Sequence, residues 1–150
     1  MGIVIRAAED SDADWILSEL QKFSSFFGSK KQLFHSAEHS IPVLKDWIKN
    51  HLVLIADDGS KRLGFISGIV HNHLYNPGIR VLTETFWWVP EEYRGTRAGA
   101  MLFDSFKKWG QKHVDWIMMT LENASPVNEK SLEKRGFKLI EKQFLLEIGD

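Results

Sequence analysis

One continuous stretch, Trp87 to Leu102, constrains the fold more than any other part of the chain. Its aromatic beginning predicts the end of a strand, Pro90 opens a short turn, and a glycine-containing loop then leads into a helix. Such a junction directs several backbone N–H groups, at the positive end of the helix dipole, towards one point. It can therefore hold a phosphate or pyrophosphate without a metal. Gly95 and Gly99 carry no Cβ, so the main chain can approach a ligand closely there.

Length and composition are those of one globular domain. A chain of 150 residues can bury roughly 70% of its unfolded surface, and 43% hydrophobic with 26% charged residues is ordinary for such a domain. No apolar run approaches the ~18 residues that cross a bilayer, and the N-terminus lacks a basic-then-apolar signal pattern. We therefore expect a single domain over residues 1–150 that is cytoplasmic and has no membrane partner.

Charge and residue usage exclude several classes of protein. The formal net charge of −1 argues against a nucleic-acid partner, which usually requires a basic stripe. The absence of cysteine excludes a thiol nucleophile, a cysteine-ligated metal and a disulfide framework. The histidines show no metal-helix spacing, and His71 and His73, which would share one face of a strand, lack a third ligand. We expect no metal site.

The first third of the chain predicts a strand and two helices. Ile3 to Ile5 is a short β-like run. Apolar residues at helical spacing predict a helix from about Ser11 to Phe26, ended by Gly28. Ser40 is expected to cap a second helix, with Pro42 tolerated in its first turn.

The middle of the chain predicts an antiparallel meander of three strands. Turn signals at Asp57–Ser60 and Asn76–Gly78 separate the strands. The strands themselves are expected at Leu52–Ala56, Leu63–Val70 and Val81–Val89.

The last third predicts two further helices and two further strands. A helix is expected from about Ala98 to Lys112, and a strand from Trp116 to Thr120. Ser125 with Pro126 is expected to start a short helix that Gly136 ends. The chain then closes in extended structure from Phe137 to Ile148, and the aromatic Trp116 is expected in the core.

The predicted order is therefore β-α-α-β-β-β-α-β-α-β. This order predicts an α+β fold of sandwich-like layers, in which helices flank a central mixed sheet. The sheet is mostly antiparallel, with one parallel pairing after the glycine-containing loop.

Three features together resemble the GNAT superfamily of acetyl-CoA-dependent N-acyltransferases. Its cofactor loop has the signature Gln/Arg-x-x-Gly-x-Gly/Ala, in which Arg94 fills the first position and Gly99 the last. The order of elements matches over nearly the whole chain, and Lys134-Arg135-Gly136-Phe137 is similar to the frequent basic-x-Gly-Phe ending of the superfamily. The compact chain and the residues from Tyr93 to Gly99 also look like small acyltransferases carried by phages.

The resemblance implies the acyl-CoA N-acyltransferase fold and acetyl-CoA as co-substrate. The backbone at the end of the long strand would pair with the pantetheine arm, and the N–H groups of the loop would cradle the pyrophosphate. The alternative for the two loop glycines is a tight turn with close packing of helix on sheet. The expected cofactor-binding residues are Trp87, Trp88, Val89, Arg94, Gly95, Thr96, Arg97, Ala98, Gly99, Ala100 and Asn128.

Two of these positions have competing interpretations. Arg97 stands where the signature has its central glycine. In right-handed helical backbone it would still donate its N–H, and its guanidinium would add a contact to a CoA phosphate; otherwise it blocks the approach. Asn128, like Asn123, lies where relatives place an asparagine on the cofactor arm, but each is also suited to cap a helix.

Glu84 is the candidate general base. Several members of the superfamily place a glutamate in this strand to relay a proton from the amine. A carboxylate among Leu82, Phe86 and Trp88 would have its pKa raised by desolvation. The alternatives are a solvated sheet face or a pair with Arg80. Strict alternation places Glu84 on one face with these apolar residues unless a bulge intervenes.

The remaining catalytic candidates are weaker. His71 and His73 are candidates for a base or for substrate contacts, against an ordinary role as exposed hairpin histidines. Many members carry a tyrosine five residues before the phenylalanine of the ending, which protonates the departing thiolate; Leu132 occupies that position here. Ser131, Tyr75 or water are the possible substitutes, and a CoA thiolate leaves tolerably well without an acid.

These features predict an N-acetyltransferase that transfers the acetyl group of acetyl-CoA to a primary amine of a small molecule or protein by direct attack. The alternative is a non-catalytic acyl-CoA-binding or protein-interaction module on a degenerate GNAT fold. Arg97 and Leu132 favour that alternative. The exposed end of the last strand can pair with a second chain, so a homodimer is a further hypothesis.

Overall fold

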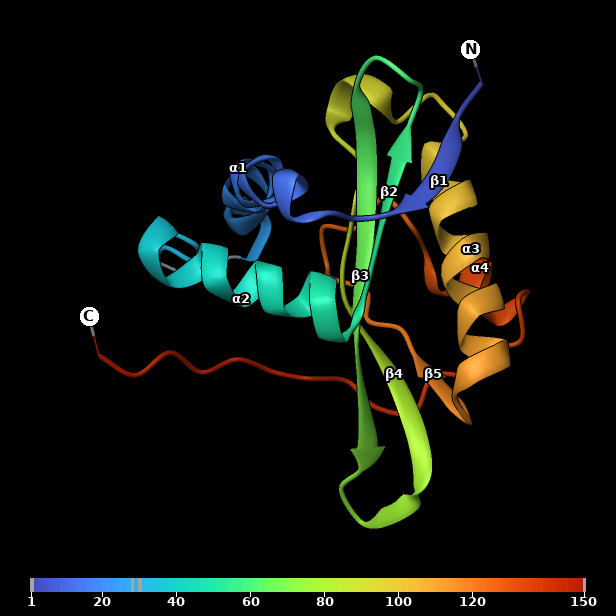
Figure 1. Ribbon diagram of the computed structural model, residues 1–150. Coiled ribbons are helices and arrows are strands. Elements are labelled where there is room, and N and C mark those ends of the chain that lie inside the picture. The colour runs from blue at the N-terminus through green and yellow to red at the C-terminus, as the bar shows by residue number, and fades with distance from the viewer. Residues whose placement is uncertain (1, 28, 30, 150) are drawn as a thin grey trace.

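A five-stranded sheet forms the centre of the molecule (Figure 1). The computed structural model describes residues 2–27, 29 and 31–149. The strands follow the order β1-β2-β3-β4-β5, the first four antiparallel and β5 parallel to β4. This confirms the predicted mixed sheet. The strands are β1 (Val4–Ala7), β2 (Leu52–Asp57), β3 (Arg62–His73), β4 (Asn76–Trp88) and β5 (Trp116–Met118).

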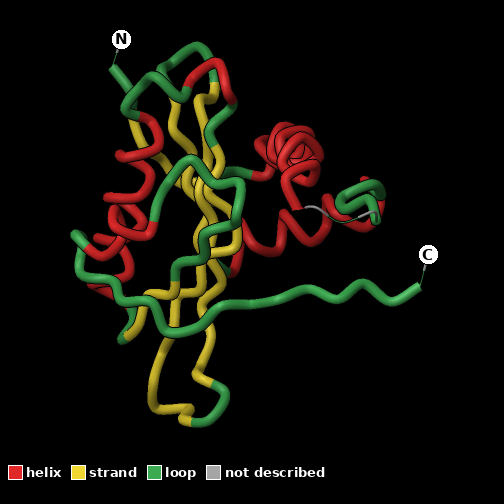
Figure 2. Tube along the Cα trace, turned by 180° about the vertical axis from the view of Figure 1, so that it is seen from behind, coloured by secondary structure: helices red, strands yellow, loops and turns green. Residues whose placement is uncertain are grey.

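Helices cover both faces of the sheet (Figures 1 and 2). On one face lie α1 (Ala13–Phe23) and α2 (Ala37–Asn50), and on the other α3 (Ala98–His113) with the short α4 (Glu129–Glu133). Short 3₁₀ turns precede α1, follow it, and lead from β4 into the loop before α3: Asp10–Asp12, Ser24–Phe27 and Glu91–Tyr93. Among the described helices, none has the length and apolar character needed to cross a bilayer.

Alternation along the strands divides the interior into two cores. Phe65 of β3 faces α1 and α2, whereas the next residue, Ile66, faces α3. The core under α1 and α2 is rich in aromatic rings, with Phe23 edge-on to both Phe86 and Trp88 at 5.5 Å between centroids. The core under α3 is mainly aliphatic around Phe106. The sheet is therefore fixed between two packed layers.

A bulge interrupts β4 where it pairs with β3. Phe86 lies opposite Ser67, but Glu84 lies opposite the next residue, Gly68, so that Thr85 is the extra residue. The hydroxyls of Ser67 and Thr85 are 2.7 Å apart and share a hydrogen bond. A bulge reverses the alternation of the strand beyond it. The side chains before and after Thr85 therefore face different cores.

Several predicted boundaries differ in detail. The second helix begins at Ala37, because Ser36 accepts the N–H of His39 at 3.2 Å and is the N-cap; Ser40 is buried inside the helix. Pro42 consequently lies beyond the first turn, inside the helix. The predicted stop of the first helix, Gly28, lies outside the described residues.

The hairpin and the last helix also shift by a few residues. The β3–β4 turn is formed by residues 74 and 75, and Asn76 to Gly78 already belongs to β4. The last helix starts after Asn128 rather than at Ser125, because Asn128 Oδ1 accepts the N–H of Ser131 at 2.9 Å. Gly136, with φ of +93°, follows the end of this helix as predicted.

The predicted final strand does not form in the sheet. Residues 138–149 are extended but carry no assigned secondary structure, and β5 is the last strand of the sheet in the described chain. Trp116, expected in the core, is 45% exposed on this edge strand and has its ring against that of His73. A strand needs a neighbour to satisfy its backbone, and none of the described strands pairs with this segment.

Candidate functional site

The junction between β4 and α3 is held closed by its own side chains. The Arg94 guanidinium donates from Nε to the Val89 carbonyl at 3.0 Å and lies 5.0 Å from the centre of the Trp88 ring. The Thr96 hydroxyl donates to the Tyr93 carbonyl at 2.7 Å and accepts the N–H of the first α3 residue at 3.2 Å. Arg94 and Thr96 therefore fix the shape of the loop from inside.

Four backbone donors of this loop have no internal acceptor. Within the described chain, no hydrogen-bond acceptor faces the N–H groups of Gly95, Arg97, Gly99 and Ala100. The last of these belong to the first turn of α3, where N–H groups are unpaired by geometry and the helix dipole is positive. The arrangement fits an anion with several oxygen acceptors, as the sequence predicted.

The loop glycines are not required by packing. A Cβ built on Gly95 meets no atom within 4 Å, and one on Gly99 meets only Val89 Cγ2 at 3.6 Å. Neither residue has the positive φ that favours glycine. By contrast, a Cβ on Gly64 or Gly68 would lie 2.8 Å from neighbouring atoms of the core. The two loop glycines therefore keep open a space that a ligand can use.

Arg97 does not obstruct the loop. Its φ of −85° and ψ of 3° are accessible to any residue, and its side chain is exposed. It is the N-cap residue of α3, with its carbonyl accepting the N–H of Met101 at 3.0 Å. The backbone thus follows a path that a non-glycine residue adopts without strain.

The outer edge of β4 is open beyond Thr83. β5 pairs with β4 only at Val81, Leu82 and Thr83, and the two strands then separate. From Glu84 onwards no described strand pairs with this edge, while the other edge continues to pair with β3 as far as Trp88. The open edge presents peptide N–H and C=O groups to an extended ligand that carries amides.

The adjacent tryptophans face opposite cores. Trp87 packs on Phe103 of α3, with 5.4 Å between ring centroids, and its indole N–H donates to the Gly99 carbonyl at 3.2 Å. Trp88 is buried under α1 and its indole N–H donates to Glu19 at 3.2 Å. Trp87 thus ties the end of β4 to the first turn of α3, so the open edge and the loop are rigidly connected.

Glu84 lies on the α3 side of the sheet. It follows Leu82 by two residues and lies opposite Gly68, both of which face the α3 core, whereas the bulge directs Phe86 to the other core. Only 7% of its surface is exposed, and among the described residues no group donates a hydrogen bond to its carboxyl. Burial, and then the charge of Glu122, raise the pKa of Glu84 to about 8.

Glu122 is the second carboxyl of this region, and the sequence did not indicate it. It follows β5 by four residues, and because β5 runs parallel to β4 their carboxyl ends lie at the same end of the sheet. Its Oε1 is buried and has no hydrogen-bond partner in the part of the chain that the structure describes. Burial also raises the pKa of Glu122. A signal was present: an acidic residue just after the parallel strand.

The two histidines lie apart from Glu84. His71 continues the alternation from Phe65, which faces α1 and α2, so it lies on the face of the sheet opposite to Glu84. Its Nε2 is 2.7 Å from the Thr83 hydroxyl and its ring is exposed. His73 lies at the hairpin end and accepts the N–H of Tyr75 through Nδ1 at 3.1 Å. The structure therefore does not bring either ring to the buried carboxyls.

The residues considered as the general acid, and the asparagine predicted to bind the cofactor arm, have other places in the fold. Leu132 is buried in α4, and Ser131 accepts a hydrogen bond from Arg135 at 2.8 Å. Tyr75 is 87% exposed at the β3–β4 turn, at the end of β4 away from the loop. Asn128 uses Oδ1 as the α4 cap. None of these side chains contacts Glu84.

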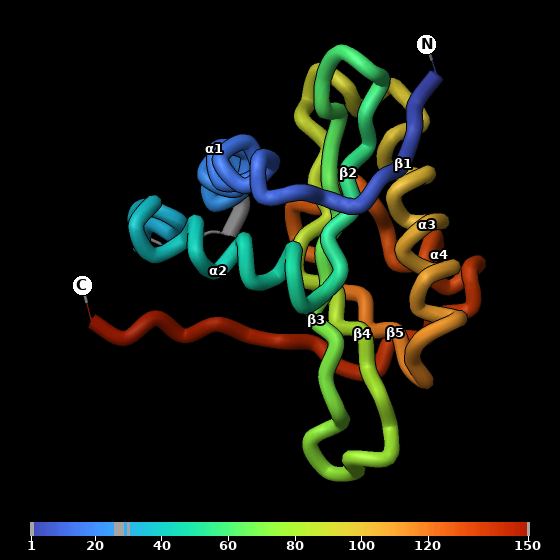
Figure 3. The backbone as a smooth tube through the Cα atoms, in the orientation of Figure 1, coloured from blue at the N-terminus to red at the C-terminus, as the bar shows by residue number. Residues whose placement is uncertain are grey.

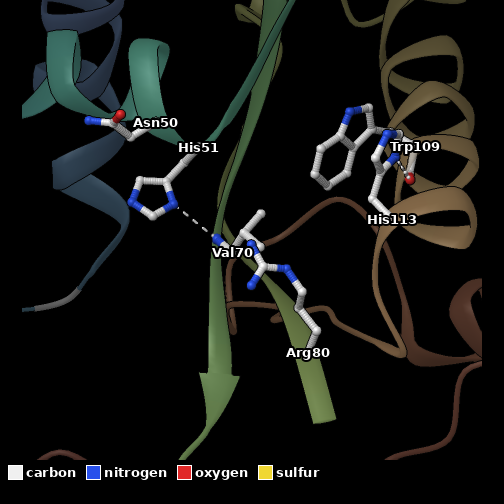
Figure 4. A pocket seen from close by; sticks show the side chains of 6 residues that line it. All are labelled: Asn50, His51, Val70, Arg80, Trp109 and His113. Atoms are coloured by element: carbon white, nitrogen blue, oxygen red, sulfur yellow. Dashed lines mark hydrogen bonds between the residues drawn. The ribbon is translucent and has the colours of Figure 1, made fainter. Parts of the chain in front are cut away.

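Described residues line a cavity beside the loop and another beside the sheet. One of about 210 Å³ adjoins the loop and is lined by Lys22, Trp88, Pro90, Glu91, Glu92 and Arg94. The other, of about 240 Å³, lies beside β3 just before β2 begins, and Figure 4 shows its side chains coming from the end of α2, from β3 and β4, and from α3. It was not indicated by the sequence. No cluster of three metal-binding side chains occurs among the residues described.

Comparison with known proteins agrees with this geometry. The model of the acetyltransferase (GNAT) family matches residues 17–137, which is most of the chain. The chain belongs to the GNAT family of acetyltransferases. The match includes the open β4 edge, the loop before α3, Glu84 and Glu122 of this GNAT protein. Comparison with curated protein sequences gives no significant match.

Solved structures share the fold over their whole length at low identity. A predicted acetyltransferase from Clostridium acetobutylicum, solved with acetyl-CoA, is 12% identical, with 98% of this chain and 97% of that chain covered and a TM-score of 0.76. A transcriptional regulator from Bacillus halodurans C-125 is 16% identical, with 98% of this chain and 100% of that chain covered, and has the same TM-score of 0.76. A ribosomal-protein-alanine N-acetyltransferase from Brucella melitensis is 13% identical, with 99% of this chain and 100% of that chain covered, and has a TM-score of 0.70. These likenesses establish the GNAT fold of the chain.

Proposed function

We propose that this GNAT protein is a single-domain N-acetyltransferase that transfers the acetyl group of acetyl-CoA to a primary amine. The observation that carries the proposal is Glu84, a buried carboxyl without a hydrogen-bond donor, located where β4 and β5 separate. A buried carboxyl of raised pKa beside an open strand edge suits proton transfer near neutrality.

Acetyl-CoA fits the open groups of the site. The unpaired N–H groups of Gly95, Arg97, Gly99 and Ala100 would hold the pyrophosphate at the start of α3. The open edge of β4 from Glu84 to Val89 would pair with the amides of the pantetheine arm. The acetyl-CoA-bound Clostridium acetobutylicum protein has the same fold, which supports this placement.

Glu84 would accept a proton from the amine. An ammonium group beside the ionised carboxylate transfers one proton to it, and the free lone pair then attacks the thioester carbonyl carbon. The C–S bond breaks, an amide forms, and the CoA thiolate takes the second proton released by the nitrogen. The thiolate leaves without a tyrosine donor, because Leu132 stands at the usual position of the acid.

Leu132 is also the observation that favours a second function, binding of acyl-CoA without turnover. The buried leucine removes the usual acid and leaves no hydroxyl at that position. Both functions would use the loop to bind acyl-CoA, but only the enzyme would transfer the acyl group. Release of CoA thiol in the presence of a broad panel of amines would establish the enzyme, whereas binding of acetyl-CoA with no release for any amine would favour the binding module.

The cofactor assignment is tested by thermal unfolding with acetyl-CoA, free CoA and ATP. A ligand at 100 times its dissociation constant should add about 2.7 kcal/mol to the free energy of unfolding, a rise in Tm of several degrees. We expect a rise with acetyl-CoA and CoA but not with ATP. Equal rises with CoA and ATP would point to a general phosphate site, and no rise would exclude the loop as a ligand site.

Gly99→Glu sharpens the test. The new carboxylate would stand at the anion cradle, in a space that tolerates a Cβ, so the fold should survive while the acetyl-CoA shift disappears. Gly78→Glu is the matched control, because it adds the same charge at the β3–β4 hairpin, at the end of β4 away from the loop (Figure 1). The control should retain the full shift; loss in both variants would argue against a local effect.

A further inference from the structure

Glu19 of α1 is a buried carboxyl that the proposed reaction does not use. Only 4% of its surface is exposed. Its Oε1 lies 3.1 Å from the Lys22 ammonium, and its Oε2 accepts the indole N–H of Trp88 at 3.2 Å. The Lys22 side chain is 62% exposed, so water screens that ion pair and it adds little stability. The buried partner of Glu19 is the Trp88 indole, and this contact needs an explanation because a carboxyl is costly to bury.

Trp88 is the last residue of β4 and connects Glu19 to the loop. The Arg94 guanidinium lies 5.0 Å from the centre of the Trp88 ring, within the range of a cation–π contact. Such a contact places the cation over the face of the ring, so it depends on how the ring is turned. The hydrogen bond to Glu19 fixes that orientation, together with Phe23, whose ring meets Trp88 edge-on at 5.5 Å. Glu19 thus holds the ring that Arg94 contacts.

Arg94 in turn fixes the start of the loop. Its Nε donates to the Val89 carbonyl at 3.0 Å, across the turn Glu91–Tyr93. The next residue, Gly95, carries the first of the unpaired N–H groups. A guanidinium that left the Trp88 ring would release this turn and change the direction of the N–H groups that follow it. A continuous series of contacts therefore leads from α1 to the anion cradle.

A cavity separates α1 from the loop beside Trp88. It is the cavity of about 210 Å³, with Lys22 on the α1 side and with Pro90, Glu91, Glu92 and Arg94 on the loop side. Figure 3 shows α1 and α3 on opposite sides of the sheet, with the chain from β4 passing across to α3. The hydrogen bond between Trp88 and Glu19 joins α1 to the end of β4 beside this gap.

We propose that Glu19 is a positioning residue of the loop: through Trp88 it keeps Arg94 in place and so preorganises the N–H groups from Gly95 to Ala100 for the pyrophosphate of CoA. The inference rests on the proposed function for the identity of the ligand. Glu19 itself does not touch the cofactor. A loop that is already ordered loses less conformational entropy on binding, so Glu19 acts on affinity and not on the chemical step.

The first test is the affinity for acetyl-CoA, measured by calorimetry, in two variants of Glu19. Glu19→Leu cannot accept the indole N–H, and we expect the dissociation constant to rise about 10-fold. With saturating acetyl-CoA, kcat of this variant should stay within about twofold of the wild type. Glu19→Gln still offers an oxygen to the indole and should bind within about twofold of the wild type.

A control separates positioning from a general loss of stability. Trp15 lies one turn earlier in α1, and its ring packs edge-on against Phe65 at 5.9 Å, away from Trp88. Trp15→Leu should lower the free energy of unfolding but leave the affinity for acetyl-CoA unchanged. Wild-type affinity in Glu19→Leu, or an equal loss of affinity in Trp15→Leu, would overturn the proposal.

A second measurement needs no ligand and separates this proposal from the proposed function. Backbone nitrogen-15 relaxation reports the order of residues 94–100 in the free protein. We expect order parameters of about 0.85 in the wild type and in Glu19→Gln, and below about 0.6 in Glu19→Leu. Unchanged order in Glu19→Leu would refute the positioning role. A wild type that binds no acetyl-CoA would instead refute the proposed function, and relaxation would still decide whether Glu19 holds the loop.

Discussion

Asp12 and Glu84 are two buried carboxyls that the fold treats in opposite ways. Asp12, 1% exposed, accepts hydrogen bonds from Arg6 at 2.9 Å, from Arg62 at 2.7 Å and from the N–H of Glu9 at 2.7 Å. Burial raises the pKa of Asp12, but the Arg6, Glu9 and Arg62 hydrogen bonds outweigh it and hold the pKa well below its usual range. This carboxylate joins β1, β3 and the turn before α1.

Glu84 has comparable burial and none of these partners. Burial and the Glu122 charge raise its pKa to about 8, so folding works against its ionised form. The proposed part of Glu84 in proton transfer would account for a carboxyl that costs stability in its ionised state. The difference teaches that burial alone does not separate a structural from a reactive carboxyl; the donors around it do.

Removing the Asp12 charge should have the largest effect on stability. Asp12→Asn leaves Arg62 without its anion and Arg6 with Asp57 alone, and we expect a loss of about 3 kcal/mol in the free energy of unfolding. Because its pKa is depressed by folding, this stabilisation is present above the unfolded pKa and is lost as pH falls through the acid range. Urea unfolding at pH 7 and at pH 3 measures both. Asp104→Asn, at an exposed position of α3, should change stability by no more than about 0.5 kcal/mol.

Removing the Glu84 carboxyl should act on turnover instead. Glu84→Gln keeps the shape but cannot accept a proton, and we expect kcat to fall about 100-fold with unchanged affinity for acetyl-CoA. Stopped assays of CoA thiol release give kcat, and calorimetry gives the affinity. Glu133→Gln, an exposed change in α4, should match the wild type. Full activity of Glu84→Gln would remove Glu84 from the mechanism.

The same substitution should change how stability depends on pH. The folded pKa of Glu84 is raised, so the folded state binds more protons than the unfolded state between the ordinary glutamate pKa and about 8. Wild-type stability should therefore decrease as pH rises through this window, by at most about 1.4 kcal/mol per pH unit from this group. Glu84→Gln should flatten that slope, as measured by urea unfolding from pH 5 to pH 9. An unchanged slope would contradict the shifted pKa.

The smallest expected effect is that of Glu122→Gln. It removes the neighbouring charge, which is the lesser cause of the Glu84 shift, while burial remains. We expect the rising limb of the pH–rate profile to move to lower pH by less than about one unit, with kcat at high pH retained. A large loss of kcat at every pH would instead give Glu122 a direct part in the reaction.

Local patterns anticipated most of the fold and the loop. Hydrophobic periodicity located the helices and strands within a few residues, and the junction at Gly95 to Ala100 is formed as its residues predict. The sequence allowed for a bulge in this strand but did not give its position at Thr85, because that position depends on the partner strand. Ser36 rather than Ser40 caps α2, since both residues suit a cap and tertiary packing buries Ser40.

Features formed by residues far apart in the sequence were harder to predict. Glu122 joins Glu84 only because β4 and β5 are parallel, a relation that no local pattern contains. The last segment has the alternation of a strand, and the sequence predicted one. A strand also needs a neighbouring strand to pair with, and the alternation alone does not identify that neighbour. His71 and Glu84 lie on opposite faces because His71 pairs with Val81, which precedes Glu84 in β4 by an odd number of residues.

The contrast between the two carboxyls is tested most directly by following their carbon-13 NMR signals from pH 3 to pH 10. The spectra of Glu84→Gln and Asp12→Asn identify which signal belongs to which carboxyl. This titration needs no knowledge of the acceptor amine. We predict that Glu84 titrates with a midpoint near pH 8 and that Asp12 remains ionised throughout. A Glu84 midpoint in the ordinary glutamate range would show that this carboxyl is solvated, and it would contradict its assignment as the base.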